Sequence, residues 1–340
     1  RCRVTFPHDE WTHQLHGHFL DASDRNMEAF VEYLEASRID DSDSNNKQWM
    51  GESKMAGGDL AAAETHMLEA LTLDPQHGRA AENLAGLYVR QLESMEEQDE
   101  QSFSRRTRAE SVHVPIERSP GELAERAAHF SRIAVMDRPD NPYNHYIAGT
   151  AALLQNRLDD ALAAYQTSID KSPKRAYSHL AIGHVHLAKG ELDAALEVAE
   201  GMCEQFPDFK ESWLLAAETR RRRSEVKEAQ EAVLRGAQAV PGEAEDFVDA
   251  MFETSKQLLD SKEAAGSVVR EFAESHWSDS GFMRTAAFML DHEGQRGHAI
   301  ALLRHVLEQS PNELQAMFRL GCLLSEDVTT KEEGRALLTR

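Results

Sequence analysis

Histidine is the residue type whose number and spacing first suggest chemistry in this chain. The sequence holds 16 histidines, and the densest groups are His13-x2-His16-x-His18 and His184-x-His186. Histidines are common zinc ligands, so these groups raise the question of a metal site. Residues two apart on a helix point to different faces, however, and do not readily bind one metal ion. The sequence therefore predicts structural histidines and no metal site.

Motifs for other kinds of catalysis are missing. The chain contains no GxSxG, HExxH, GxxxxGK[ST] or GxGxxG. Carboxylate pairs such as Asp159-Asp160 occur in a chain with 59 acidic residues, where such pairs arise by chance. The three cysteines are scattered and form no CxxC: Cys2, Cys203 and Cys322. We therefore predict a chain that is not an enzyme and holds no cofactor.

The charge and hydropathy of the chain limit its partners. With 37 basic and 59 acidic side chains the formal net charge is −22, which repels nucleic-acid phosphates. No run of about 18 apolar residues occurs, so we expect no membrane insertion. The cysteine pattern favours the cytoplasm. The chain begins at Arg1 without a basic and apolar leader, and a signal peptide already removed stays an alternative.

One basic run stands out in this acidic chain, Arg220-Arg221-Arg222-Arg223. It falls at the C-terminal end of a predicted helix, where positive charge complements the helix dipole. We favour this structural role. Contact with an acidic peptide is the alternative, and Arg221 is the residue that would make it.

The elements that position these residues follow a repeat. The stretch Pro142–Pro207 superposes on itself with a shift of 34 residues, which places Pro173 on Pro207 and Gly149 on Gly183. Each unit is predicted to be two helices. In the Pro142 unit a polar turn at 156–157 separates them. Gly58 and Gly190 are expected to make the same turn in other units. A fixed period of this size predicts a repeat architecture.

These residues resemble the tetratricopeptide repeat (TPR), a 34-residue helix-turn-helix motif. The Pro142 unit supplies the matching Ala148-Gly149, Ala161, Tyr165, Ser168 and Pro173. The resemblance implies an all-α, right-handed superhelical solenoid of stacked hairpins, with small residues where helices approach closely. Nine units are predicted, the last incomplete, and they start near Glu10, Ser44, Gly78, Pro142, Ala176, Lys210, Ala244, Ser280 and Leu314.

The repeat register also gives the histidines a role. His13, His145 and His179 fall at position 4, where the family places a large packing residue. His16 at position 7 and His186 at position 11 are expected to pack as well.

We divide the chain into four segments. Residues 1–93 hold the N-terminal units, 94–119 a disordered loop insertion, 120–243 the regular block, and 244–340 divergent C-terminal units. In the interrupted third unit the first helix is predicted to end near Glu93 and the second to begin near Gly121. A docking or phosphorylation segment around Ser111 is the alternative reading of the insertion. Because the ninth unit stops at Arg340 inside its second helix, we expect the chain to be a fragment of a longer protein.

The resemblance implies that positions 2, 5, 9 and 12 of the first helices line a concave groove. The candidate partner-binding residues at these positions are Tyr143, Tyr146, Thr150, Tyr177, His184, Glu211, Glu218 and Arg221. Packing between units is an equal alternative for the tyrosines. Some TPR proteins bind a C-terminal carboxylate through Lys at position 5 and Asn at position 9. Position 9 is never Asn here, so this carboxylate clamp is not expected.

The predicted function is a non-catalytic TPR scaffold that binds a peptide or partner protein in its concave groove and supports complex assembly. The alternative is a substrate-docking arm of a larger enzyme, of glycosyltransferase or sulfotransferase type, with its catalytic domain outside this chain. Homo-oligomerisation through exposed solenoid ends is left open.

Overall fold

The structure, a computed structural model, describes residues 9–102, 119–240, 246–276, 280–326 and 329–339. In these ranges it contains eighteen helices and no strand. The chain forms two compact units, Arg1–Val185 and His186–Arg340. The boundary falls inside α10 (Ala176–Lys189), a place that the sequence did not indicate.

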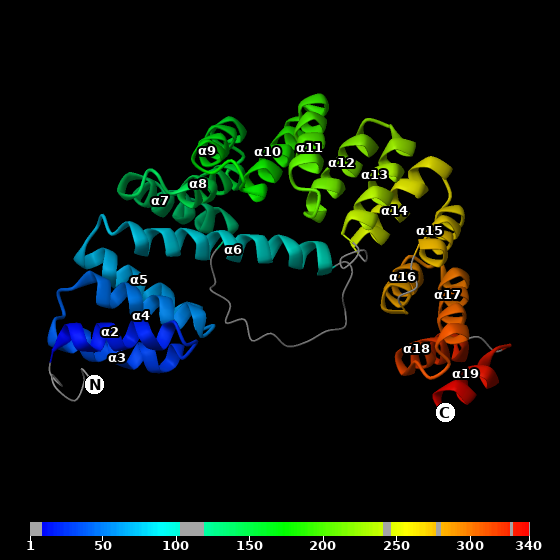
Figure 1. Cartoon of the computed structure of the whole chain (residues 1–340), viewed down its shortest axis with the longest axis horizontal. Coiled ribbons are helices and arrows are strands. Elements are labelled where there is room, and N and C mark those ends of the chain that lie inside the picture. The colour runs from blue at the N-terminus through cyan, green and yellow to red at the C-terminus, as the bar shows by residue number, and fades with distance from the viewer. Residues whose placement is uncertain (1–8, 103–118, 241–245, 277–279, 327–328, 340) are drawn as a thin grey trace. The chain divides into compact units, whose positions relative to one another are not determined.

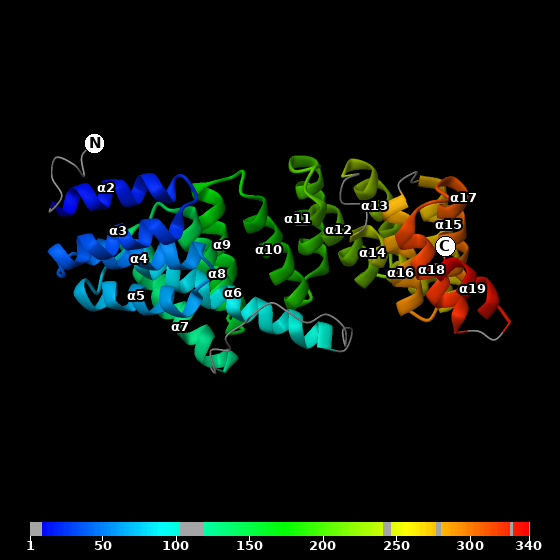
Figure 2. The ribbon, with the colours of Figure 1, turned by 90° about the horizontal axis from the view of Figure 1, so that it is seen from below.

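Unit 1 is built from helices that pair with their neighbours in sequence. Its helices before α10 are α2 (Glu10–Asp21), α3 (Asn26–Ile39), α4 (Ser44–Ala56), α5 (Leu60–Leu73), α6 (Gly78–Ser102), α7 (Pro120–Asp137), α8 (Pro142–Leu154) and α9 (Leu158–Lys171). Figures 1 and 2 both show α2 to α5 lying side by side, and each of these helices packs on the next. The main core of the unit lies among α5, α6, α7 and α8.

Unit 2 repeats the same pairing. Its helices after α10 are α11 (Leu192–Gln205), α12 (Lys210–Arg222), α13 (Val226–Ala239), α14 (Asp246–Leu259), α15 (Lys262–His276), α16 (Ser280–His292), α17 (Arg296–Gln309), α18 (Leu314–Ser325) and α19 (Lys331–Leu338). The hairpins are α12–α13, α14–α15, α16–α17 and α18–α19. In eight of the nine predicted repeats the first helix begins on the predicted residue. The predicted start of the seventh repeat, Ala244, lies outside the described residues, and its first helix, α14, is described from Asp246. The all-α repeat fold is therefore confirmed.

The turns and close approaches have the expected residues. Gly58 and Gly190 have φ values of 82° and 74°, and Asn156 has 56°, a backbone region that glycine and asparagine tolerate best. A Cβ added at Gly149 would lie 2.6 Å from the ring of Tyr165, so the two helices of this hairpin meet only because the position is glycine.

The end of α6 differs from the prediction. The helix continues to Ser102, nine residues beyond the end expected near Glu93. The sequence from 94 to 102 contains neither glycine nor proline and is rich in Glu and Gln, which favour helix without any apolar periodicity. Residues 103–118, with Ser111, lie outside the described residues. The second helix, α7, begins at Pro120, where the side chain of Ser119 accepts a hydrogen bond from the Glu122 amide.

Candidate functional site

Two of the predicted groove residues, Tyr143 and Tyr146, lie together on α8. They are three residues apart, so they occupy one face of the helix. Their ring centroids are 6.4 Å apart and the planes are tilted by only 16°. Both rings are half-buried and pack against the core formed by α5 to α8. The tyrosines therefore pack between repeats while each ring keeps an exposed part.

Arg175 completes this group, and the sequence analysis did not select it. It lies in the turn between α9 and α10, and its guanidinium carbon is 5.2 Å from the ring centroids of both Tyr143 and Tyr146. A cation at this distance from an aromatic ring is attracted by the ring's quadrupole. The only signal in the sequence is its place two residues before Tyr177, just before a first helix.

The start of α10 extends the group. Ser168 of α9 links the beginning of α10 to the beginning of α8, because its hydroxyl lies 2.7 Å from the Pro142 carbonyl oxygen and 2.9 Å from the Ser178 hydroxyl. Tyr177 lies at the beginning of α10 and is 56% exposed, and His184 on the same helix is also exposed. Large exposed aromatic side chains supply binding area with little loss of conformational entropy. We call Tyr143, Tyr146, Arg175 and Tyr177 the tyrosine cluster.

Thr150 does not belong to this surface, contrary to the prediction. It is 7% exposed. Its hydroxyl donates to the Tyr146 carbonyl at 3.1 Å and accepts a hydrogen bond from the Tyr165 hydroxyl at 3.0 Å. The large Tyr165 side chain reaches across the hairpin and covers Thr150, which the position of Thr150 in the repeat did not reveal.

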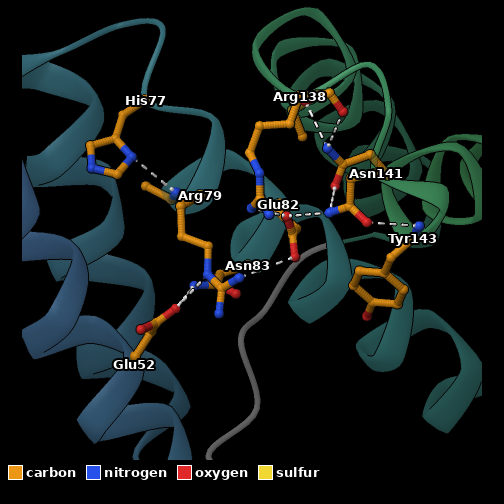
Figure 3. Close-up of polar contacts among 11 residues, drawn as sticks. Glu52, His77, Arg79, Glu82, Asn83, Arg138, Asn141 and Tyr143 are labelled. Atoms are coloured by element: carbon orange, nitrogen blue, oxygen red, sulfur yellow. Dashed lines mark hydrogen bonds and ion pairs between the residues drawn. The ribbon is translucent and has the colours of Figure 1, made fainter. Parts of the chain in front are cut away.

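A buried polar network fixes the start of α8 (Figure 3). The Glu82 carboxylate of α6 is 7% exposed and accepts hydrogen bonds from Arg138 Nη1 at 2.8 Å and Asn141 Nδ2 at 3.0 Å. Asn141 Oδ1 in turn accepts from the amide of Tyr143 at 3.1 Å and so caps the helix. Because the buried carboxylate has several donors, its burial does not leave an unsatisfied charge.

The same network includes α4. Glu52 accepts hydrogen bonds from Arg79 Nε at 2.9 Å and Asn83 Nδ2 at 2.8 Å (Figure 3). The hydrogen bond to Glu52 raises the pKa of Arg79. Arg79 and Glu82 stand at positions 2 and 5 of the repeat, so the side chains at these groove positions are engaged within the protein.

In unit 2, two predicted groove residues pair with each other. Arg221 Nε donates to Glu218 at 2.7 Å, and Arg222 Nε donates to the same carboxylate at 2.6 Å. Glu211 is half-buried on the same helix, α12.

The rest of the arginine run is also paired. Arg220 donates to Glu200 at 2.7 Å, and Arg223 donates to Glu225 at 2.8 Å. Every arginine from 220 to 223 thus has a carboxylate of the same chain as partner, which supports the structural role that we favoured for the run.

Three of the histidines that the repeat register assigned to packing lie next to carboxylates of the protein. His13 is buried, with Nδ1 2.7 Å from the Glu32 carboxylate, and His16 Nδ1 lies 3.1 Å from the other oxygen of that carboxylate. His186 Nδ1 is 2.7 Å from Glu191. Within the ranges that the structure describes, no three or more His, Cys, Asp or Glu side chains are grouped to hold a metal ion.

The aromatic residue at position 4 of three repeats makes the same hydrogen bond, which we did not predict from the sequence. His145 Nε2 lies 2.7 Å from the Pro139 carbonyl, and His179 Nε2 lies 3.0 Å from the Pro173 carbonyl. Since a carbonyl only accepts, the ring N–H donates in both cases. The Trp213 indole does the same to the carbonyl of Pro207 at 2.9 Å. Each ring therefore fastens a first helix to the proline turn before it.

No helix in the described part of the chain combines the length and apolar character needed to cross a bilayer.

The comparisons with known proteins concern the fold. The tetratricopeptide repeat family model matches residues 122–176 and 180–244. A search of curated proteins finds no match. Among solved structures, PilW, titled a widely conserved type IV pilus biogenesis factor, has a TM-score of 0.50 at 17% identity and covers 68% of this chain and 93% of its own.

Two further structures are similar at lower scores. PilF of Pseudomonas aeruginosa has a TM-score of 0.49 at 15% identity, with coverage of 70% of this chain and 96% of its own. MamA of Desulfovibrio magneticus RS-1 has 0.46 at 17%, with coverage of 58% and 94%. Likeness at these identities concerns the fold alone. The matched repeats and the 34-residue series of paired helices show a fold of stacked tetratricopeptide repeats.

Proposed function

We propose that the chain is a non-catalytic scaffold and that the tyrosine cluster of unit 1 binds an extended peptide segment of a partner protein. The observation that carries this proposal is the pair of nearly parallel, half-buried tyrosine rings on α8, with a guanidinium beside both and the exposed Tyr177 at the start of the next first helix. Rigid aromatic rings next to an arginine are the residue types that dominate binding at protein interfaces.

The network beneath the cluster supports the same proposal. Glu82 and Asn141 fix the first turn of α8 through buried hydrogen bonds, so the rings are held before any ligand arrives. A site that is already ordered loses less conformational entropy on binding. His184 extends the proposed surface along α10, whereas Glu218 and Arg221 of α12 neutralise each other and offer less to a partner.

A display selection tests the proposal. The full chain is immobilised, a random dodecapeptide library is panned on it, and the affinities of recovered peptides are measured for the wild type and Tyr177→Ala. We expect Tyr177→Ala to weaken these peptides about tenfold or more, because aromatic anchors carry a large share of binding energy. Met136→Ala is the matched control, since Met136 is 77% exposed on a second helix, α7.

Circular dichroism checks that both variants keep their helix content. Recovered peptides that bind Tyr177→Ala as tightly as the wild type would contradict the proposal.

A further inference from the structure

Arg175 differs from the arginines near it. Arg79 and Arg138, in the network next to α8, are paired with Glu52 and Glu82. Among the described residues, the guanidinium of Arg175 makes neither a hydrogen bond nor an ion pair, and its Nε is buried without an acceptor. In a chain with 59 acidic side chains, this lack of a carboxylate partner needs a physical account.

Packing against the rings of Tyr143 and Tyr146 explains only part of why Arg175 lacks a carboxylate partner. The rings hold the guanidinium in place, but ring faces do not replace a hydrogen-bond acceptor for its buried Nε–H. A buried donor without an acceptor costs free energy, and that cost is recovered when a ligand supplies the acceptor. A carboxylate is the group that fits best, because its two oxygens match two parallel N–H donors of a guanidinium.

We propose that Arg175 binds the carboxylate of an aspartate or glutamate side chain in the bound peptide. This inference rests on the proposed function and specifies its ligand: an acidic residue lies beside the two tyrosine rings. Arg175 stands in the turn before a first helix, outside positions 5 and 9. The contact therefore does not depend on the positions of the carboxylate clamp, and a side-chain carboxylate is sufficient for it.

The same library tests this inference with a different variant. Peptides recovered on the wild type are sequenced, and the affinity of one acidic peptide is compared with that of its Asp→Asn or Glu→Gln counterpart. We expect enrichment of acidic residues at one peptide position, and a loss of about tenfold to a hundredfold for Arg175→Gln. The neutral peptide should bind the wild type and Arg175→Gln equally.

Two controls keep the test independent of folding. Arg157→Gln removes an exposed arginine, paired with Asp160, from the turn before α9, and should leave the affinity unchanged. Arg175→Lys keeps the charge and should retain part of the affinity, while the peptide substitution leaves the protein intact.

The outcomes separate the two proposals. Peptides that depend on Tyr177, show no acidic enrichment and bind Arg175→Gln as well as the wild type would overturn the carboxylate inference and leave the peptide-binding proposal standing. Failure to recover any peptide that depends on Tyr177 would overturn both.

Discussion

The first helices α8 and α12 hold the same place in their repeats, yet their groove positions carry different chemistry. On α8 two tyrosines stack beside Arg175, and the start of the helix is held by Arg138 and Asn141, which share the buried carboxylate of Glu82. On α12 the positions of the two tyrosines hold Glu211 and Leu214, and the later groove positions 9 and 12 hold Glu218 and Arg221, which neutralise each other at the surface. One backbone motif thus presents an aromatic surface in one repeat and a self-paired ionic surface in another.

The interiors of the α8–α9 and α12–α13 hairpins also differ, in the pair of residues that face each other between the two helices. Position 8 is Gly149 on α8, where the facing residue is the buried Tyr165. On α12 position 8 is Ala217, and the residue at the position of Tyr165 is Val233. A large side chain across the hairpin requires glycine, and a smaller one leaves room for a methyl group. The comparison shows that surface and core vary separately on one repeat backbone.

The buried network of α8 should be the most sensitive point. We expect Glu82→Ala to lower the free energy of unfolding by about 3 kcal/mol, because Arg138 and Asn141 lose their shared acceptor. Urea denaturation followed by circular dichroism measures this change. A loss below that of an exposed ion pair would show that the network does not stabilise the repeat.

The close approach of Gly149 on α8 to Tyr165 on α9 should have the second-largest effect on stability. Gly149→Ala should cost about 2 kcal/mol, because the new Cβ overlaps the buried ring of Tyr165. Gly201→Ala in α11 is the matched control, since a Cβ there meets no other atom within 4 Å. It should stabilise the protein by about 0.5 kcal/mol. Equal effects of the two changes in urea denaturation would contradict this account.

The surface pair of α12 should matter much less. Glu218→Ala removes the partner of both Arg221 and Arg222, and we expect it to cost about 0.5 kcal/mol, because exposed ion pairs are screened by water. The difference from the wild type should shrink further in 1 M NaCl. An effect as large as that of Glu82→Ala would show that the surface pair of α12 stabilises the protein as much as the buried network of α8 does.

Cys203 of α11, on the side that faces α12, allows a chemical test that needs no substitution in the protein. Burial raises the pKa of the Cys203 thiol to about 11, and this outweighs the opposite effect of Arg220. Thiolate is therefore scarce at pH 8, and iodoacetamide should modify Cys203 about a hundredfold more slowly than in the urea-unfolded chain. Peptide mass spectrometry measures both rates. Equal rates would show that the thiol is not buried against α12.

Local sequence signals predicted the fold well. The 34-residue period located the hairpins, and Gly58, Gly190 and Asn156 marked turns with positive φ. The continuation of α6 was missed because the prediction relied on apolar periodicity, whereas helix propensity alone continues the helix to Ser102.

The site was predicted less well because it depends on contacts between repeats. Tyr143 and Tyr146 were selected for the candidate site from their register. Arg175 was missed because only the folded turn brings it to rings some 30 positions earlier in the chain. Thr150 was assigned to the groove because its register does not reveal that Tyr165 covers it.

The central claim is that the tyrosine cluster binds the peptide, and photo-crosslinking tests it most directly. Benzoylphenylalanine is placed at position 177 or, as a control, at position 136, and each protein is irradiated with a bound peptide from the library. We predict a crosslinked peptide at position 177 and none at position 136. Crosslinking at 136 with none at 177 would contradict the account.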